Sequence, residues 1–379
     1  MHHYGCAGVR RCARGAKKWD CYLSVVCYNE WEHVNPILYQ LTKKFLFMLS
    51  PETAHELTLS CLRVAEKMRI LRLVAGKPVE DPVEVMGLRF PNRVGLAAGM
   101  DKQGNTVEAF GALGFGFVEV GTLTPRPQPG NPKPRLFRCI PQQAIINHMG
   151  INNPGIDQGV ENLSSISRFK GVLGVNISKN KVTPNDEARM DYLACLRAAW
   201  PVADYVAINF SCPNVPNLCE LAKAASAADL LASLKSEQAN LSQDTGRYVP
   251  IVMKVSPDMS DEQIRELAHV FQDCQLDGLI CTNTTTARVG VEGHPAAKES
   301  GGLSGAPLYN RANETLEAFA QELAGRIPII GVGGITKPED AVAKIRAGAS
   351  LVQLYSGFIY KGPDLIRSCA KAIRDFSAR

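Results

Sequence analysis

The sequence of 379 residues lacks three features that would each place it in a different class of protein. It contains no run of 18 or more apolar residues, so we expect no membrane-spanning helix. Its 12 cysteines form neither a Cys-x-x-Cys pair nor a Cys/His finger, which argues against a disulfide framework and a zinc or other metal site. The net charge of +5 is too small to indicate a nucleic-acid partner.

The first 35 residues differ in composition from the rest. Residues 1–18 carry several Arg and Lys and no acidic residue, and four cysteines fall before residue 30. Such a segment is typical either of an organellar presequence or of a basic tail outside the fold, and both interpretations stay open. We predict that residues 1–35 are disordered.

Two helices are predicted between residues 36 and 75. Apolar residues recur at helical spacing from Ile37 to Met48, and Ser50-Pro51-Glu52 is typical of a helix start. Both helices also carry Lys and Arg. They either cap the main domain or enter a lipid interface, and composition alone favours the cap.

From about residue 83 short apolar strands alternate with amphipathic helices. The candidate strands are residues 93–98, 116–121, 172–177, 205–210, 251–255, 278–282, 327–332 and 351–355. Eight strands in this pattern predict a closed α/β barrel, the (β/α)8 or TIM barrel, at residues 79–379, with residues 36–78 as a small helical extension. An open doubly wound sheet is the alternative. The Pro/Gly-rich insertions at residues 122–155 and 284–307 are predicted to be long loops over the active end.

Polar or glycine residues follow every predicted strand, at the barrel end where such enzymes place their chemistry. The most informative of these ends is Asn209-Phe-Ser-Cys212-Pro-Asn214. Its thiol could act as a base or as a nucleophile, and its two asparagines could hold a flat, polar substrate.

The last two strands are followed by glycine-rich turns. Gly331-Val-Gly-Gly334, Tyr355-Ser-Gly357 and the upstream Gly301-Gly-Leu-Ser-Gly305 suit a phosphate site built from backbone N–H groups, although each alone could be a tight turn. Lys254 ends a strand that reads as buried. A phosphate site beside such a cation suggests a phosphorylated aromatic cofactor, and flavin mononucleotide (FMN) fits.

Several motifs together resemble the dihydroorotate dehydrogenases, in order from about residue 36 to the C terminus. They include Ala97-Ala-Gly-Met-Asp-Lys102, Gly121-Thr-Leu-Thr-Pro-Arg-Pro-Gln-Pro-Gly-Asn131, Pro134-Arg-Leu-Phe-Arg138, the 209–214 turn and the glycine-rich turns. The segment at residues 46–56 resembles the membrane-associated, quinone-using class 2 enzymes. The resemblance implies that (S)-dihydroorotate is oxidised to orotate in de novo pyrimidine (UMP) biosynthesis: a base takes the C5 proton and the C6 hydride passes to N5 of FMN, which then reduces ubiquinone or menaquinone.

The resemblance also implies roles for residues at matching motif positions. Cys212 would be the base, and His55 and Arg138 would lie near the quinone. The substrate would be bound by Lys102, Asn147, His148, Met149, Gly150, Ile151, Asn209, Asn214, Asn283 and Thr284. The flavin would be bound by Ala98, Gly99, Thr122, Asn176, Asn209, Lys254, Thr282, Gly305, Gly333, Gly334, Tyr355 and Ser356. We further expect a monomer with peripheral membrane contact through residues 36–78, on the cytoplasmic face of a bacterial inner membrane or, alternatively, on the mitochondrial inner membrane.

Three positions depart from the class 2 pattern. Cys212 stands where class 2 enzymes place a serine, Val215 replaces a threonine, and Ile151 replaces a phenylalanine. A cysteine is the easier base, because its unperturbed pKa of about 8.5 is far closer to neutrality than that of a serine hydroxyl. We hypothesise a class 2 scaffold with a class 1-like base. The alternatives are a soluble class 1-type enzyme using fumarate or NAD, and a non-catalytic flavin-binding barrel.

Overall fold

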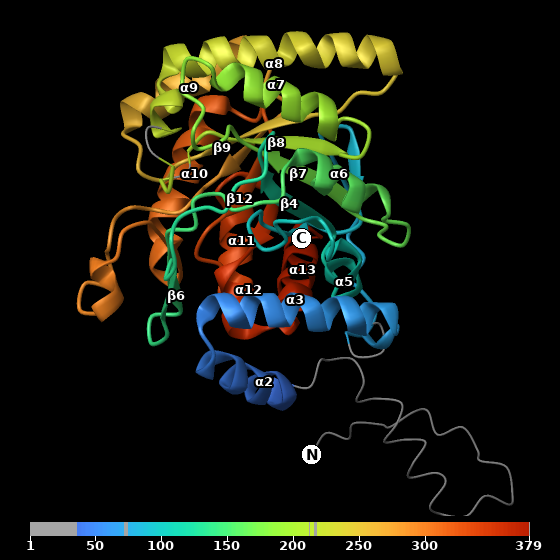
Figure 1. Cartoon of the computed structure of the whole chain (residues 1–379), viewed down its shortest axis with the longest axis vertical. Helices are drawn as coiled ribbons and strands as arrows, with labels where there is room; N and C mark the ends of the chain where they lie inside the picture. Colours follow the sequence, from blue (N-terminus) through green and yellow to red (C-terminus); the bar gives the residue numbers. More distant parts are fainter. Residues whose placement is uncertain (1–35, 72–74, 212, 216–217, 379) are drawn as a thin grey trace, which may run out of the picture.

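The computed structural model describes residues 36–71, 75–211, 213–215 and 218–378 (Figure 1). The predictions for residues 1–35 and for Cys212 therefore fall outside the described residues. The predicted closed parallel barrel is confirmed, in the strand order β10-β12-β13-β3-β4-β7-β8-β9. Its strands are β3 (Val94–Leu96), β4 (Phe117–Leu123), β7 (Val172–Ile177), β8 (Tyr205–Asn209), β9 (Ile251–Val255), β10 (Gly278–Cys281), β12 (Ile329–Val332) and β13 (Ala349–Leu354).

The barrel strands are apolar almost throughout because both of their faces are buried. Two glycines make room for aromatic rings inside the barrel. A Cβ on Gly174 would lie 2.2 Å from the Tyr205 ring, and one on Gly95 would lie 2.3 Å from the Phe117 ring. Tyr205 can therefore cross the neighbouring strand and reach the centre of the barrel.

Helices cover the outside of the barrel and bury one apolar face each (Figure 1). In α9, a capping box of Ser260 and Gln263 fixes the start, and Ile264, Leu267 and Phe271 face the core. The helices are α5 (Val107–Ala112), α6 (Ile156–Ser164), α7 (Ala188–Ala199), α8 (Ala224–Thr245), α9 (Asp261–Asp273), α10 (Tyr309–Leu323), α11 (Pro338–Arg346), α12 (Ser356–Lys361) and α13 (Asp364–Ser377), with short 3-10 turns η1 (Leu218–Ala222), η2 (Pro295–Lys298) and η3 (Ala306–Leu308).

A short hairpin precedes the barrel. Its strands are β1 (Val83–Val85) and β2 (Leu88–Phe90), and the Phe90 ring packs edge-on against Phe117 inside the barrel at 5.2 Å. The hairpin thereby closes the end of the barrel opposite the site.

The two predicted insertions do lie over the active end, where Asn147 and Ser304 line the pocket at the strand ends, but they are not loops throughout. The insertions contain β5 (Leu136–Cys139), β6 (Ala144–Asn147) and β11 (Gly302–Gly305), which form an antiparallel sheet in the order β11-β6-β5. Each strand has only four residues, and β6 pairs with β11 across more than 150 positions. Such short, distant pairing leaves no periodic pattern in the sequence.

The two predicted N-terminal helices are confirmed as α2 (Pro36–Met48) and α3 (Pro51–Lys67), at one end of the molecule (Figure 1). Side chains of α2 bind the last carbonyls of α12: the Tyr39 hydroxyl donates to Ile359 O at 2.7 Å and Lys43 Nζ to Tyr360 O at 3.0 Å. Within the described chain, no helix combines the length and the apolar character needed to cross a bilayer.

Candidate active site

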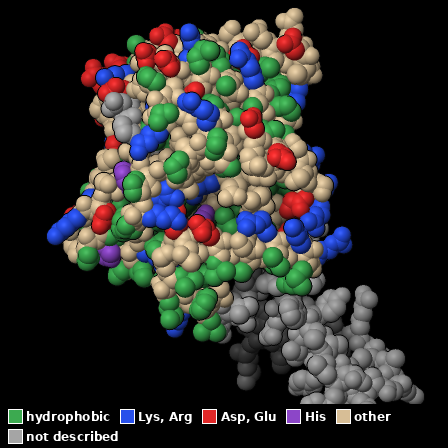
Figure 2. All heavy atoms as spheres, viewed as in Figure 1, with side chains coloured by type: hydrophobic (Ala, Val, Ile, Leu, Met, Phe, Trp, Pro, Cys, Tyr) green, Lys and Arg blue, Asp and Glu red, His purple; other side chains and the backbone are tan. Residues whose placement is uncertain are grey.

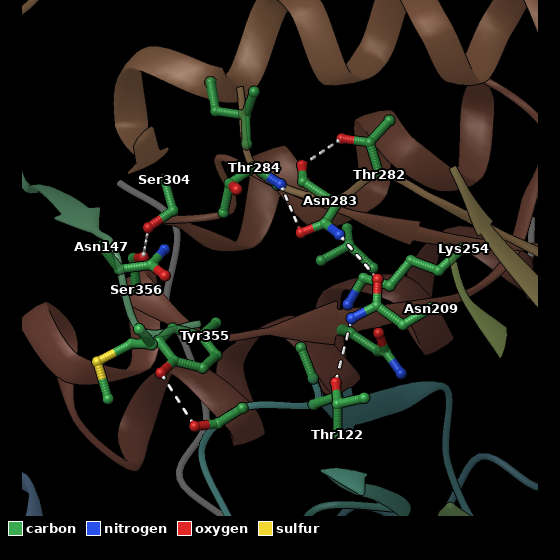
Figure 3. A pocket seen from close by; sticks show the side chains of 18 of the residues that line it. Thr122, Asn147, Asn209, Lys254, Thr282, Asn283, Thr284, Ser304, Tyr355 and Ser356 are labelled. Carbon is green, nitrogen blue, oxygen red and sulfur yellow. Dashed lines mark hydrogen bonds between the residues drawn. The ribbon is translucent and has the colours of Figure 1, made fainter. Parts of the chain in front are cut away.

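One cavity, here called the central cavity, opens where the barrel strands end, and most of the predicted site residues line it (Figure 3). The C-terminal ends of the parallel strands lie at the same end of the barrel, so residues far apart in the sequence lie close together here. The predicted residues in its lining are Ala98, Gly99, Lys102, Thr122, Asn147, Met149, Gly150, Ile151, Asn209, Asn214, Lys254, Thr282, Asn283, Thr284, Gly305, Gly333, Gly334, Tyr355 and Ser356.

Side-chain amides form one wall of the central cavity. Asn283 Nδ2 donates to Asn209 Oδ1 at 3.3 Å, and Asn214 Nδ2 donates to Asn147 Oδ1 at 2.8 Å. The buried Oδ1 of Asn214 has no partner within the described protein. An unpaired buried acceptor is costly, so this wall is suited to a ligand that carries N–H donors.

Lys102 supplies a cation to the central cavity. Its ammonium group donates to Gly99 O. Burial lowers the pKa of Lys102 to about 8, against the opposing charges of Glu52 and Asp101. At neutral pH the side chain remains mostly protonated and can bind a carboxylate.

Three glycines in the lining of the central cavity, Gly305, Gly333 and Gly334, are here called the glycine cradle. Gly305, Gly333 and Gly334 have φ angles of 100°, 103° and 79°, which L side chains rarely adopt. A Cβ on Gly334 would lie 2.3 Å from Tyr309 Cα, and one on Gly305 would lie 2.2 Å from Gln143 O. Only glycine fits these close contacts with neighbouring residues, and glycine-rich turns of this kind are typical of a phosphate site built from backbone N–H groups.

The lining also includes polar groups that the sequence analysis missed. Ser304 pairs with Ser356, Oγ to Oγ at 2.8 Å, and the buried Gln353 has an Oε1 without a partner in the described residues. Gln353 is the buried polar residue of the otherwise mostly apolar strand β13. A polar residue inside a buried strand was the available signal.

Two predicted site residues lie apart from the central cavity. Asn176 is fully buried beneath it, with its Oδ1 2.6 Å from Thr122 Oγ1. His148 lies in the β5–β6 region, where its backbone N–H donates to Arg135 O at 2.7 Å. Cys212 falls outside the described residues, between the described Ser211 and Pro213.

A second hollow, here called the α3 groove, adjoins the central cavity. It shares Lys102, Met149 and Asn152 with that cavity and is also lined by Glu52 and His55 of α3. Burial, followed by the charge of Lys102, lowers the pKa of His55 to about 3. His55 is therefore neutral near pH 7. Its ring then has one N–H donor and one acceptor nitrogen for hydrogen bonds to a neutral ligand.

Arg138 lies against α2 and does not line the α3 groove. Its guanidinium group donates to Leu49 O at 2.9 Å and to Phe47 O at 3.3 Å, and it stacks over the Phe47 ring at 4.6 Å. These bonds occupy carbonyls at the end of α2, which have no partners within the helix.

The polar atoms and the glycine cradle suit a flat, hydrogen-bonding ring that carries a phosphate. The side chain of Lys254, 6% exposed, also lines the central cavity, close to Asn209 (Figure 3). This donor and acceptor set fits a phosphorylated flavin, because the cradle would accept the phosphate, and unpaired Gln353 Oε1 would accept a ring N–H.

Comparisons with known proteins support this arrangement. A family model described as dihydroorotate dehydrogenase matches residues 82–376. A protein named dihydroorotate dehydrogenase (quinone) from Akkermansia muciniphila is 67% identical over 341 residues, covering 90% of this chain and 98% of its own length. One of the same name from Cellvibrio japonicus is 52% identical over 339 residues, covering 89% and 99%. A crystal structure of DHODH from Eimeria tenella in complex with ferulenol superposes with a TM-score of 0.79 at 34% identity, covering 86% of this chain and 91% of that one.

Proposed function

The chain belongs to the dihydroorotate dehydrogenase family, and we therefore propose that the central cavity binds dihydroorotate against FMN while a quinone reaches the α3 groove. Like its quinone-dependent relatives, the enzyme oxidises dihydroorotate to orotate in pyrimidine biosynthesis, with a quinone as electron acceptor. The observation that carries the proposal is the meeting of Lys102, the amide wall and the glycine cradle in one cavity.

Lys102 and the amides bind the substrate. Dihydroorotate is anionic, and its ring edge alternates carbonyl acceptors with N–H donors. The ammonium group of Lys102 pairs with the substrate carboxylate, and Asn147, Asn209, Asn214 and Asn283, with Thr284, pair with the ring edge. These hydrogen bonds along the ring edge fix the orientation of the ring, and with it the face from which C5 and C6 react.

The remaining predicted residues hold the flavin. The backbone N–H groups of the glycine cradle, with Ser356, would bind its phosphate, and Thr122, Thr282 and Lys254 would bind its ring, while Asn176 supports Thr122 from beneath the cavity. FMN, when bound, accepts the two electrons of the C6 hydride and passes them to the quinone. Lys254 favours the reduced ring because a cation in a low-dielectric site stabilises negative charge.

Cys212 removes the C5 proton. The position of Cys212 in the sequence, between Asn209 and Asn214, supports this role, and the proton would move from C5 to its sulfur as the hydride leaves C6. Val215 is buried and apolar, so it offers no hydroxyl to relay that proton. A thiolate needs less assistance than a serine alkoxide, because its pKa lies nearer the working pH.

The quinone enters from a membrane surface. Apolar side chains remain exposed on α2 and α3, and Figure 2 shows hydrophobic groups gathered at this end of the molecule. The most exposed are Leu41, Phe45, Met48, Val64 and Met68. Immersing this face in lipid would place the α3 groove and neutral His55 within reach of a quinone, on the cytoplasmic face of a bacterial inner membrane.

The deciding experiment compares electron acceptors. Purified enzyme with dihydroorotate should turn over with a short-chain quinone and should show at most trace rates with fumarate or NAD. Equal or higher rates with fumarate or NAD would instead favour the soluble class 1 alternative. Absence of flavin reduction by dihydroorotate under anaerobic conditions would overturn the proposed function altogether.

A further inference from the structure

Glu119 is a carboxylate buried inside the barrel below the central cavity. It is 0% exposed, and its three partners are all neutral donors. Asn176 Nδ2 lies 2.8 Å from Oε1, while Tyr205 Oη and Gln353 Nε2 lie 2.9 and 2.7 Å from Oε2. No basic side chain forms an ion pair with it in the part of the chain that the structure describes. Burying a carboxylate without a positively charged partner costs free energy, which indicates that Glu119 has a role beyond packing.

A chain of hydrogen bonds leads from Glu119 to the substrate amides. Asn176 donates one end of its amide to Glu119 and accepts from Thr122 Oγ1 at 2.6 Å with the other. Thr122 Oγ1 in turn accepts from Asn209 Nδ2 at 3.1 Å. Asn209 Oδ1 accepts from Asn283 Nδ2 at 3.3 Å (Figure 3).

Every bond in this chain points the same way, toward the carboxylate. A carboxylate can only accept, so Asn176 must present its NH2 group to Glu119 and its oxygen to Thr122. The Thr122 hydroxyl then donates to Asn176 and is left to accept from Asn209. The amide orientation of Asn209 follows from an acceptor that lies outside the cavity. That of Asn283 is set jointly by this chain and by the backbone N–H of Thr284, which donates to Asn283 Oδ1 at 2.9 Å.

We propose that Glu119 is a positioning residue: it orients the Asn209 and Asn283 amides through Asn176 and Thr122, and its charge lowers the reduction potential of the bound flavin. The second effect follows from Coulomb repulsion, because the extra electrons on a reduced flavin would lie above a buried negative charge. The proposal rests on the proposed function, since it assigns the cavity to a flavin and to orotate.

Two substitutions separate orientation from charge. Glu119→Gln keeps an acceptor for Asn176 and removes the charge. Its flavin should become easier to reduce, with at least a tenfold gain in the reduction equilibrium constant, or about 30 mV for a two-electron couple. Thr122→Val keeps the charge and breaks the chain in the middle, so it should weaken orotate binding at least tenfold.

Thr122→Ser is the matched control, because it retains the hydroxyl and should bind orotate as the wild type does. Neither readout, an orotate titration of the flavin spectrum or a redox titration, depends on turnover. If Thr122→Val and Thr122→Ser bind orotate equally well, the orientation role is overturned. An unchanged potential in Glu119→Gln overturns the role of the charge.

A fourth variant tests the role of the charge if Glu119→Gln fails to retain flavin. Tyr205→Phe keeps the carboxylate but removes one of its donors, which leaves the charge less compensated, so the potential should shift in the negative direction; no shift, or a positive one, would overturn the role of the charge. Failure of wild-type enzyme to bind orotate, or to be reduced by dihydroorotate, would count against the proposed function rather than against the role of Glu119.

Discussion

Lys102 lies between two hollows, and His55 faces it from one of them. Lys102 lines both the central cavity and the α3 groove, whereas His55 lines only the groove. The charge of Lys102 contributes, after burial, to holding the pKa of His55 near 3. The residue assigned to the substrate carboxylate is therefore also an electrostatic neighbour of the proposed quinone site.

The pKa of Lys102, lowered to about 8 by burial, predicts an alkaline limit to substrate capture. Above that pH the free enzyme loses the cation that binds the carboxylate, so kcat/KM for dihydroorotate should fall with an apparent pKa near 8. Lys102→Arg stays charged and should move this limb to higher pH, at some cost in affinity. A pH profile with the same alkaline limb in both proteins would assign it to another group.

A second pH effect is expected from Cys212. As a base it must be deprotonated, so its contribution to activity should rise with pH, whereas that of Lys102 falls. Cys212→Ala should retain bound flavin but lose its reduction by dihydroorotate by at least about 10²-fold, the usual contribution of a general base. Cys212→Ser should remain active only at higher pH, because the hydroxyl is a far weaker acid than the thiol. Stopped-flow absorbance of the oxidised flavin measures both. Reduction of the alanine variant at the wild-type rate would exclude Cys212 as the base.

The barrel could be predicted from sequence because its strands are short, apolar and regularly separated by amphipathic helices. The strand ends then placed Lys102, Asn209, Lys254 and Asn283 on one rim without further information. The β5-β6-β11 sheet could not be predicted, because strands of four residues pair over long separations. The same limit hid the contact between Gln353 and Glu119, which lie 234 positions apart.

Two polar residues inside otherwise apolar strands point to a polar cluster within the barrel. Glu119 interrupts the apolar strand Phe117–Leu123, and Gln353 interrupts Ala349–Leu354. A charge in a strand buried on both faces must have partners. That reasoning predicts a polar cluster inside the barrel, although it does not say which donors compose it.

The Glu52–Arg135 ion pair holds α3 against the insertion that contains β5. Arg135 Nη2 lies 2.7 Å from Glu52 Oε1, and the two side chains are only 7% and 13% exposed. Glu52→Ala would leave a buried guanidinium without its carboxylate, so it should lower the unfolding free energy by about 3 kcal/mol, near the low end for a broken buried pair. Urea unfolding monitored by flavin release measures this. Glu56→Ala, in the exposed part of the same helix, should change stability by less than about 0.5 kcal/mol.

Because α2 exposes an apolar face, we expect that a substitution on this face weakens membrane binding without changing the catalytic step. Phe45 is 58% exposed, and burying a phenylalanine in an apolar phase contributes about 2 kcal/mol. Phe45→Glu should therefore reduce partitioning onto phospholipid vesicles by about 30-fold or more, and turnover with a vesicle-borne long-chain quinone should fall with it. Turnover with a soluble short-chain quinone should stay close to the wild-type rate. Met190→Glu, at an equally exposed position on α7, is the matched control and should bind vesicles normally; equal losses in both variants would show that α2 is not the membrane-binding face.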